Sequence, residues 1–204
     1  MFRVVRIAVG VVVLAALLGC GVIVGSTYYK RHRAEALLRE VARLKLGQHP
    51  TFADAQHLAQ SYGGEPWNGP SRKANCSSES CNLRFAFENK PLSYLPGVRT
   101  VEFVVGLTVK DGYVISSEID YSILTSSYYE FIYFIEDHSK STDVHGYQLD
   151  KLKIDSQGIP HVLKVSLSPL ATSEDRARAY SLDLSCLARL SGCNSPSAIF
   201  PRDL

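Results

Sequence analysis

The chain has 204 residues, of which 46% are hydrophobic and 21% are charged, and its formal net charge is +2. This length and apolar content are sufficient for one well-packed domain and exclude a chain that is disordered throughout. The small charge excess excludes a protein built around nucleic acid, and five cysteines are too few for a disulfide-dense miniprotein.

The N-terminal region contains an apolar segment that is long enough to cross a membrane. Residues 7–29 carry no charged side chain. A helix over them, at about 1.5 Å per residue, measures roughly 34 Å, which matches the hydrocarbon thickness of a bilayer. We therefore expect residues 1–6 to form an N-terminal tail and residues 7–29 to form an uncleaved transmembrane helix, with the lipid bilayer as a partner.

A lipoprotein signal is the alternative interpretation of the same segment. The motif Leu17-Leu18-Gly19-Cys20 resembles a bacterial lipobox, and Arg3 and Arg6 supply the positive charge in front of it. Cleavage there would leave Cys20 as the lipidated residue. A lipoprotein normally becomes polar directly after the lipidated cysteine. Here the apolar run continues past Cys20 to Val24, and this favours the uncleaved helix.

The flanking charges and the cysteines indicate opposite orientations of the domain. Six basic residues follow the span within positions 30–45 and two precede it, which favours a cytoplasmic domain by the positive-inside rule. The four cysteines outside the span form two close pairs, Cys76 with Cys81 and Cys186 with Cys193. Disulfides persist in oxidising compartments, and long domains translocate largely regardless of flanking charge. We therefore expect local disulfides in an extracytoplasmic, periplasmic domain.

Two alternatives for the cysteines stay open. They are reduced thiols in a cytosolic domain, or a four-cysteine zinc site, although the C-x4-C and C-x6-C spacings lack the short knuckle typical of zinc. The basic residues at 30–45 have two interpretations as well. They hold the stalk helix against anionic lipid, or they are simply its solvated face.

Two helices are expected before the first strand. Apolar residues recur every three or four positions between 34 and 44, and Thr51 and Asp54 form a capping box that opens a second helix. Residues 30–62 are therefore predicted to be a helical stalk and a second helix. Residues 63–80 are rich in Gly, Pro, Ser and Asn without periodicity, which predicts a surface loop.

From Cys81 onward the apolar period is two, as in half-buried strands. The clearest pattern is a hairpin, in which residues 101–109 and 113–121 flank the turn Asp111-Gly112. Further strands are expected at 82–87, 128–135, 147–154, 161–167 and, with helix as the alternative, 176–186. Residues 81–204 are thus predicted to form an antiparallel domain of about six strands with a C-terminal disulfide segment, and the fold class is α+β with the helix pair packed on one sheet face.

Two parts of this pattern resemble known families. The run Leu46-Gly47-Gln48-His49-Pro50-Thr51 through Gly63-Gly64-Glu65-Pro66 is similar to the opening of the small lipoproteins of the outer-membrane β-barrel assembly machinery. That resemblance implies a helix pair packed on a meander. The whole chain, with C-x4-C before the first strand and C-x6-C near the end, resembles uncharacterised single-span membrane proteins of acidobacteria, a family that implies no particular activity.

The sequence offers few residues for chemistry. It contains no nucleophile elbow, Walker loop, dinucleotide fingerprint or His-Glu-x-x-His motif, so we expect no catalytic residue, cofactor or metal. Glu118 and Asp120 would share one strand face, as paired carboxylates or a cation site, or simply as the solvated side of a sheet. Trp67 stands alone in the polar loop and is a candidate partner contact or a lid on the core.

These features predict a membrane-anchored extracytoplasmic module that binds an envelope protein or another envelope component without catalysis. The first alternative is a small envelope enzyme or cation-binding protein that uses the acidic sheet face at Glu118 and Asp120. The second alternative is a membrane regulator whose domain faces the cytosol.

Overall fold

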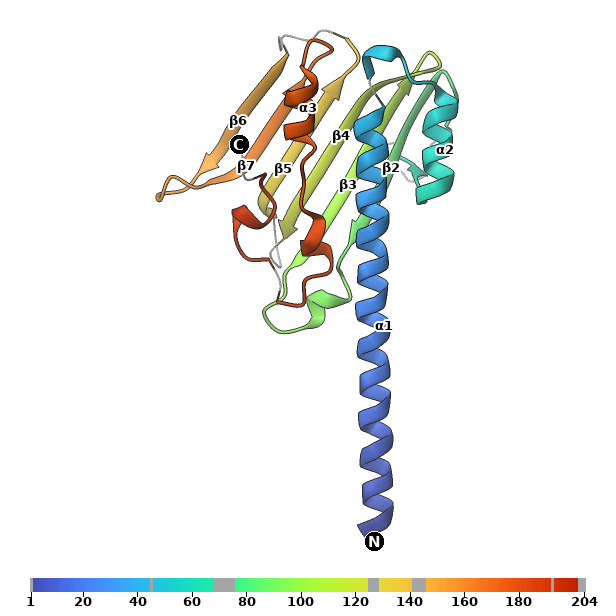
Figure 1. Cartoon of the computed structure of the whole chain (residues 1–204), viewed down its shortest axis with the longest axis vertical. Helices are drawn as coiled ribbons and strands as arrows, with labels where there is room; N and C mark the ends of the chain where they lie inside the picture. The colour runs from blue at the N-terminus through green and yellow to red at the C-terminus, as the bar shows by residue number, and fades with distance from the viewer. Residues whose placement is uncertain are drawn as a thin grey trace.

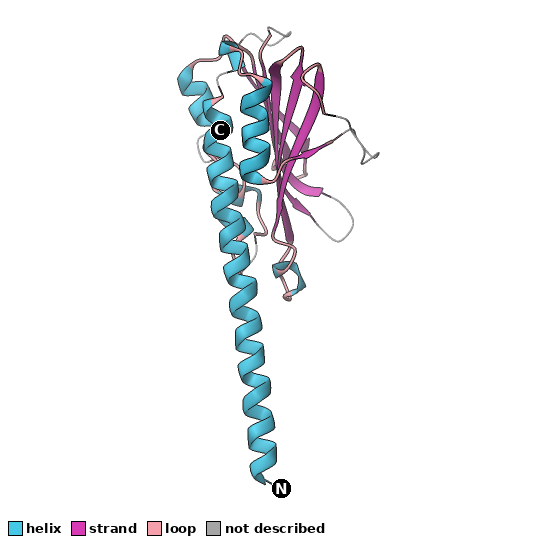
Figure 2. Ribbon diagram, turned by 90° about the vertical axis from the view of Figure 1, so that its right-hand side faces the viewer, coloured by secondary structure: helices cyan, strands magenta, loops and turns pink. Residues whose placement is uncertain are grey.

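The computed structural model of the chain describes residues 2–44, 46–67, 76–124, 129–140, 146–191 and 193–201. Figure 1 shows a long N-terminal helix that lies beside a seven-stranded sheet and projects well beyond it. Figure 2 shows that the helices cover one face of this sheet. The predicted α+β class, with helices on one sheet face, is confirmed.

Helix α1 (Phe2–Arg43) has two parts with different surroundings. The large apolar side chains described between positions 11 and 22 are exposed, and α1 is the one described helix that is long and apolar enough to cross a membrane. The last part of α1 lies against the sheet. Its buried residues are those of the predicted stripe: Ala34, Leu37, Leu38 and Val41.

A 3₁₀ turn, η1 (Leu46–Gln48), connects α1 to helix α2 (Phe52–Tyr62). The backbone N–H of Thr51 donates to Asp54 Oδ2 at 2.7 Å, and the N–H of Asp54 donates to Thr51 Oγ1 at 3.4 Å. These two bonds satisfy amide groups that the first turn of a helix leaves without partners, and they confirm the predicted capping box. The helix ends where Gly63 adopts a left-handed conformation with φ 77°.

Seven strands form the sheet. Their bounds are β1 (Glu65–Pro66), β2 (Ser80–Glu88), β3 (Thr100–Lys110), β4 (Tyr113–Leu124), β5 (Tyr129–His138), β6 (Tyr147–Ile154) and β7 (Pro160–Leu167). Strands β3 and β4 form the predicted hairpin, and Asp111 and Gly112 have φ angles of 52° and 86°. A two-residue turn with both φ angles positive matches the twist of the flanking strands. The hairpin prediction is confirmed.

One strand pair departs from the predicted antiparallel pattern. The sheet order is β1-β2-β3-β4-β5-β7-β6, with β5 and β7 parallel and β6 antiparallel to β7 at the edge. The chain leaves β5, forms the edge strand β6, and returns through a hairpin that places β7 between them. The sheet is therefore mixed. The antiparallel prediction rested on loop lengths, and loop lengths do not reveal which strands become neighbours.

The segment at 176–186, favoured as a strand by its alternation, is not a strand. It contains the end of helix α3 (Ser173–Ala179) and most of the 3₁₀ turn η3 (Leu184–Leu187). A second capping box, between Thr172 and Asp175, opens α3 and competes with the period-two pattern. The strand prediction is wrong because this segment packs across the sheet and buries its apolar side chains without pairing as a strand. Alternation of apolar and polar residues alone cannot distinguish these two cases.

The predicted loop at 63–80 contains a short strand, since Glu65–Pro66 pairs with β2 as β1. Residues 68–75 of this loop lie outside the described part of the chain. Tyr128, the predicted first residue of a strand, also lies outside it.

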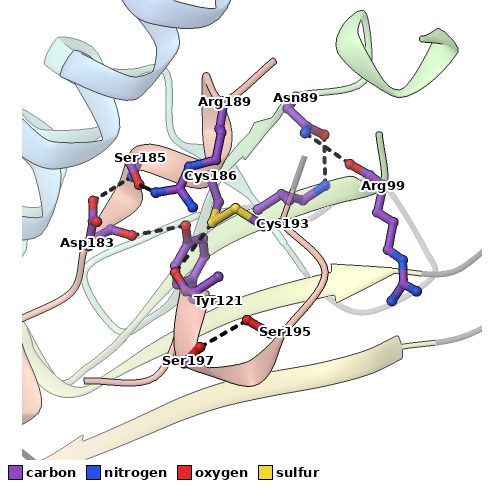
Figure 3. Close-up of a disulfide and its surroundings, with 12 residues drawn as sticks. Asn89, Arg99, Tyr121, Asp183, Ser185, Cys186, Arg189, Cys193, Ser195 and Ser197 are labelled. Carbon is purple, nitrogen blue, oxygen red and sulfur yellow. Dashed lines mark hydrogen bonds between the residues drawn. A yellow bond between two sulfur atoms is a disulfide. The ribbon is translucent and has the colours of Figure 1, made fainter. Parts of the chain in front are cut away.

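Both cysteine pairs are joined as disulfides that close short loops. Cys76 is bonded to Cys81 and Cys186 to Cys193, with Cα–Cα distances of 4.6 and 5.8 Å. These are the local pairs that the spacing favours. Figure 3 shows the second disulfide next to Tyr121 of β4, and both of its cysteines are buried in the core.

The core lies between the helices and the face of the sheet that they cover, here called the inner face. Alternate residues of the central strands point into it, and two further 3₁₀ turns, η2 (Leu92–Tyr94) and η4 (Pro196–Ala198), lie at its borders. Fully buried core side chains include Leu37, Phe85, Phe103, Leu107, Ile119, Tyr121, Ile123, Tyr133, Ile135 and Leu167. The opposite face of the sheet, here called the outer face, carries the side chains that alternate with these.

Candidate functional site

The outer face carries a hollow of about 340 Å³, which we call the outer-face hollow. Its polar and aromatic lining consists of Trp67, Asn82, Arg84, Glu102, Thr108, Glu118, Asp120 and Phe134. These residues come from β2, β3, β4 and β5 and from the residue that follows β1. The strand pairing therefore assembles the hollow from segments that are distant in the sequence.

The register of the strands explains why these side chains meet. Gly106 of β3 lies opposite Arg84 on one side and Glu118 on the other. Asp120 lies opposite Val104 and Phe134. Because Gly106 has no side chain, the floor of the sheet is open at its centre, with charged and aromatic groups around it.

Arg84 and Trp67 form one wall of the hollow. The guanidinium carbon of Arg84 lies 4.9 Å from the centroid of the Trp67 ring, and Arg84 Nη2 donates to Glu102 Oε1 at 2.8 Å. The backbone N–H of Trp67 donates to the carbonyl oxygen of Asn82 at 2.7 Å. Trp67 is still 39% exposed, so one part of its ring stacks on a cation while another part faces solvent.

Two carboxyl groups of the hollow have raised pKa values because of their surroundings. Burial raises the pKa of Asp120 to about 6, with a further contribution from the negative charge of Glu102. The buried Oδ1 atom of Asp120 has no hydrogen-bond partner among the residues that the structure describes. Glu102 is 9% exposed, and burial raises its pKa although Arg84 opposes this. Glu118, in contrast, is exposed at the rim.

A second hollow, of about 500 Å³, lies on the other side of the same wall. Trp67 and Arg84 line it together with Glu65, Pro66 and Ala86. The stacked pair thus faces open space on both sides.

The arrangement determines which chemistry the hollow can perform. Three carboxylates surround a single guanidinium, so the field favours a positively charged or hydrogen-bond-donating group. The rings of Trp67 and Phe134 provide flat apolar surface beside these acceptors. Across the described part of the chain, no group of three or more His, Cys, Asp or Glu residues is arranged to hold a metal ion.

The sequence identified part of this site. Glu118 and Asp120 were candidates as a pair on one strand face and Trp67 was a candidate as a lone loop residue, and the structure brings all three to one hollow. Cys20, the lipidation candidate, does not belong to this hollow. It is exposed on the apolar part of α1.

The other residues of the hollow, among them Arg84, Glu102, Gly106 and Phe134, were not predicted from the sequence. A charged residue inside an otherwise apolar strand was the available signal for Arg84 and Glu102. Only the folded structure shows that their side chains meet, since Arg84 reaches along β2 and β3 to Glu102.

No protein-family model, curated protein or solved structure matches this chain. The resemblances to known families that the sequence indicates therefore stay predictions.

Proposed function

We propose that the protein is a membrane-tethered, extracytoplasmic binding module that takes its ligand in the outer-face hollow. The observation that carries this proposal is the partly exposed Trp67 ring stacked on Arg84 beside the buried Glu102 and the half-buried Asp120. Burying acidic groups near an open surface costs stability, and such a cost is typical of binding sites.

The tether and the compartment have separate support. Helix α1 is long and apolar enough to cross a bilayer, and the apolar part of it stands clear of the domain. The two disulfides favour an oxidising compartment, which in a bacterial envelope is the periplasm. Together they support a single-pass protein with its domain outside the cytoplasm.

The proposed ligand is a basic segment of an envelope protein that presents a lysine or arginine side chain. A cationic head would replace part of the interaction that Arg84 now makes with Glu102, and its methylene stem would lie on Trp67. The volume of about 340 Å³ suits one long side chain better than a folded surface.

A fluorescence titration tests this proposal. Trp67 is the only tryptophan of the chain, so its emission reports on the hollow directly. A lysine tripeptide should change the emission saturably, whereas a glutamate tripeptide should not. The double variant Glu102→Gln with Asp120→Asn should bind at least about tenfold more weakly, because a charge-assisted hydrogen bond contributes about 1.5 kcal/mol or more.

The matched control is Asp150→Asn, which removes an acid from the outer face at the edge strand β6, outside the hollow. Asp150→Asn should bind the lysine tripeptide as the parent does. If both peptides gave the same response, or if the double variant bound like the parent, the hollow would not be a site for basic segments.

Orientation is tested independently by thiol labelling of intact cells. A membrane-impermeant maleimide should label the four paired cysteines only after reduction with an agent that stays outside the cell. Labelling that requires cell lysis would instead support the alternative, a regulator whose domain faces the cytosol.

A small envelope enzyme is the second candidate function, and one observation favours it. A carboxyl with a pKa of about 6, such as Asp120, can exchange protons near neutral pH, as a general acid or base must. Alanine at Glu118 and at Asp120 separates the two functions. A lost turnover with retained ligand binding would support the enzyme.

A further inference from the structure

One loop of the domain lies beside α1 close to the point where its apolar span ends. This loop, residues 89–99, connects β2 to β3 and contains η2. Figures 1 and 2 both show it at the end of the domain from which the N-terminal part of α1 projects, and η2 contacts α1. We call it the α1-proximal loop.

The α1-proximal loop is held firmly at its base. The Asn89 side chain donates to the carbonyl oxygen of Arg99 at 3.1 Å and accepts from the N–H of Val101 at 2.7 Å. Leu92 is fully buried, and Lys30 Nζ of α1 donates to the carbonyl oxygen of Glu88 at 3.3 Å. The loop therefore keeps a fixed height along α1.

The tip of the loop is apolar and exposed. Tyr94 is 80% exposed and Leu95 is 43% exposed, although the base of the loop is buried. Tyr28 and Tyr29 are exposed on α1, at the end of the same uncharged run. Exposed tyrosines thus occur on two separate elements near the end of the span.

The height of the loop agrees with the thickness of a bilayer. Thr27 is completely buried, so the domain already covers α1 at this position. The uncharged residues below it, 7–26, extend roughly 30 Å as a helix, which matches the hydrocarbon thickness of a bilayer. The level of Thr27 is therefore the level of the lipid headgroups, where tyrosines are enriched.

We propose that the α1-proximal loop is a second membrane contact, with Tyr94 and Leu95 inserted in the headgroup region of the bilayer. This inference rests on the tether of the proposed function. The occupant is lipid because the exposed tip continues the apolar surface of α1 at the same height. The contact holds the domain at two points, so that the strands stand alongside the helix axis and the outer-face hollow opens sideways, parallel to the membrane surface.

Depth-dependent quenching of tryptophan tests the contact in the full-length chain. Since Trp67 is the only tryptophan, Trp67→Phe gives a background without one. Tyr94→Trp is then added to this background, and the protein is reconstituted in vesicles of phosphatidylcholine and phosphatidylglycerol with or without brominated lipid. We expect emission at a shorter wavelength than in water and a clear loss of intensity with lipid brominated near the headgroup.

Tyr113→Trp in the same background is the matched control. Tyr113 is also an exposed tyrosine, 49% accessible, and lies at the opposite end of β3 and β4. A strand as long as β3, with 11 residues, separates the two positions by roughly 35 Å. Brominated lipid should leave the emission at position 113 unchanged.

The outcomes distinguish the contact from the tether. Equal emission loss at positions 94 and 113, or none at either, in protein that co-floats with the vesicles would overturn the loop contact and leave the tether intact. Protein that fails to co-float would refute the tether itself. Leu95→Trp provides a second probe in case Tyr94→Trp unfolds, and a loop in contact with a protein partner would show no bromine effect in purified vesicles at either position.

Discussion

Each face of the sheet carries an aspartate whose pKa is raised by desolvation, but the neighbours of the two carboxylates differ. On the inner face Asp137 is 3% exposed and forms an ion pair with Arg176 of α3. The Tyr180 hydroxyl donates to Asp137 Oδ2 at 3.4 Å, and Ser117 Oγ lies 3.2 Å from that hydroxyl. On the outer face Asp120 lies beside an ion pair made within the sheet.

The two ion pairs differ in the element that supplies the arginine. Arg176 comes from a different layer and also donates to the carbonyl oxygen of Ser168 at 2.8 Å, so the inner pair fastens α3 to the sheet. Arg84 and Glu102 come from neighbouring strands and connect no further layer. A buried charge that joins layers serves the fold, whereas one at an open hollow is available to a ligand. Three variants test this contrast.

The largest effect is expected on the inner face. Arg176→Met would leave the buried Asp137 carboxylate without its cation, and such a loss costs about 3–5 kcal/mol. The free energy of unfolding from urea titrations in detergent measures it. Adding Asp137→Leu should recover part of the loss, because two apolar groups leave no buried charge.

Arg178→Met is the control for this prediction. Arg178 is exposed and pairs at 3.7 Å with Glu174 within α3. Its loss should change the free energy of unfolding by less than about 1 kcal/mol. If the two variants were equally stable, the inner pair would not fasten the layers.

The outer face should respond in the opposite direction. The pKa of Asp120 is raised from 3.8 to about 6, so the folded state binds its proton more tightly than the unfolded state does. Stability contributed by this group is therefore present at low pH and is lost as the pH rises from about 4 to about 6. Asp120→Asn should then stabilise the protein at about pH 8, by up to about 3 kcal/mol.

Below about pH 3 the same variant should have no such advantage, since Asp120 is then protonated in both the folded and the unfolded state. Glu118→Gln, at the exposed rim of the same hollow, is the control and should change stability by less than about 0.5 kcal/mol. A gain from Asp120→Asn that did not depend on pH would contradict the assigned burial cost.

The smallest effect is expected at the turn that serves both faces. Gly112 has φ 86°, and a Cβ built on it would meet nothing within 4 Å, so Gly112→Val adds backbone strain alone. That strain costs about 1–2 kcal/mol. Lys110→Val, in the adjacent strand position, is the control. Ligand binding and stability should decline together in Gly112→Val, because β4 carries Glu118 on one face and Ile119 on the other.

Local patterns in the sequence determined much of the fold. The apolar run of α1, the capping box at Thr51 and the hairpin at Asp111-Gly112 each depend on residues within a few positions of one another. Such features need no knowledge of distant partners. The same locality explains the error at 176–186, where a capping box and an alternating pattern competed within one short segment.

Only the tertiary structure decided which segments are neighbours. Strand β7 lies between β5 and β6 because it pairs with both, and no local pattern encodes that choice. The outer-face hollow depends on it in the same way, since the register places Arg84, Gly106 and Glu118 in one row from three strands. Periodicity assigns a side chain to a face of the sheet, but long-range backbone hydrogen bonds set its position on that face. For this reason the pair Glu118 and Asp120 could be proposed from the sequence and Trp67 separately from it, and only the folded sheet makes them one site.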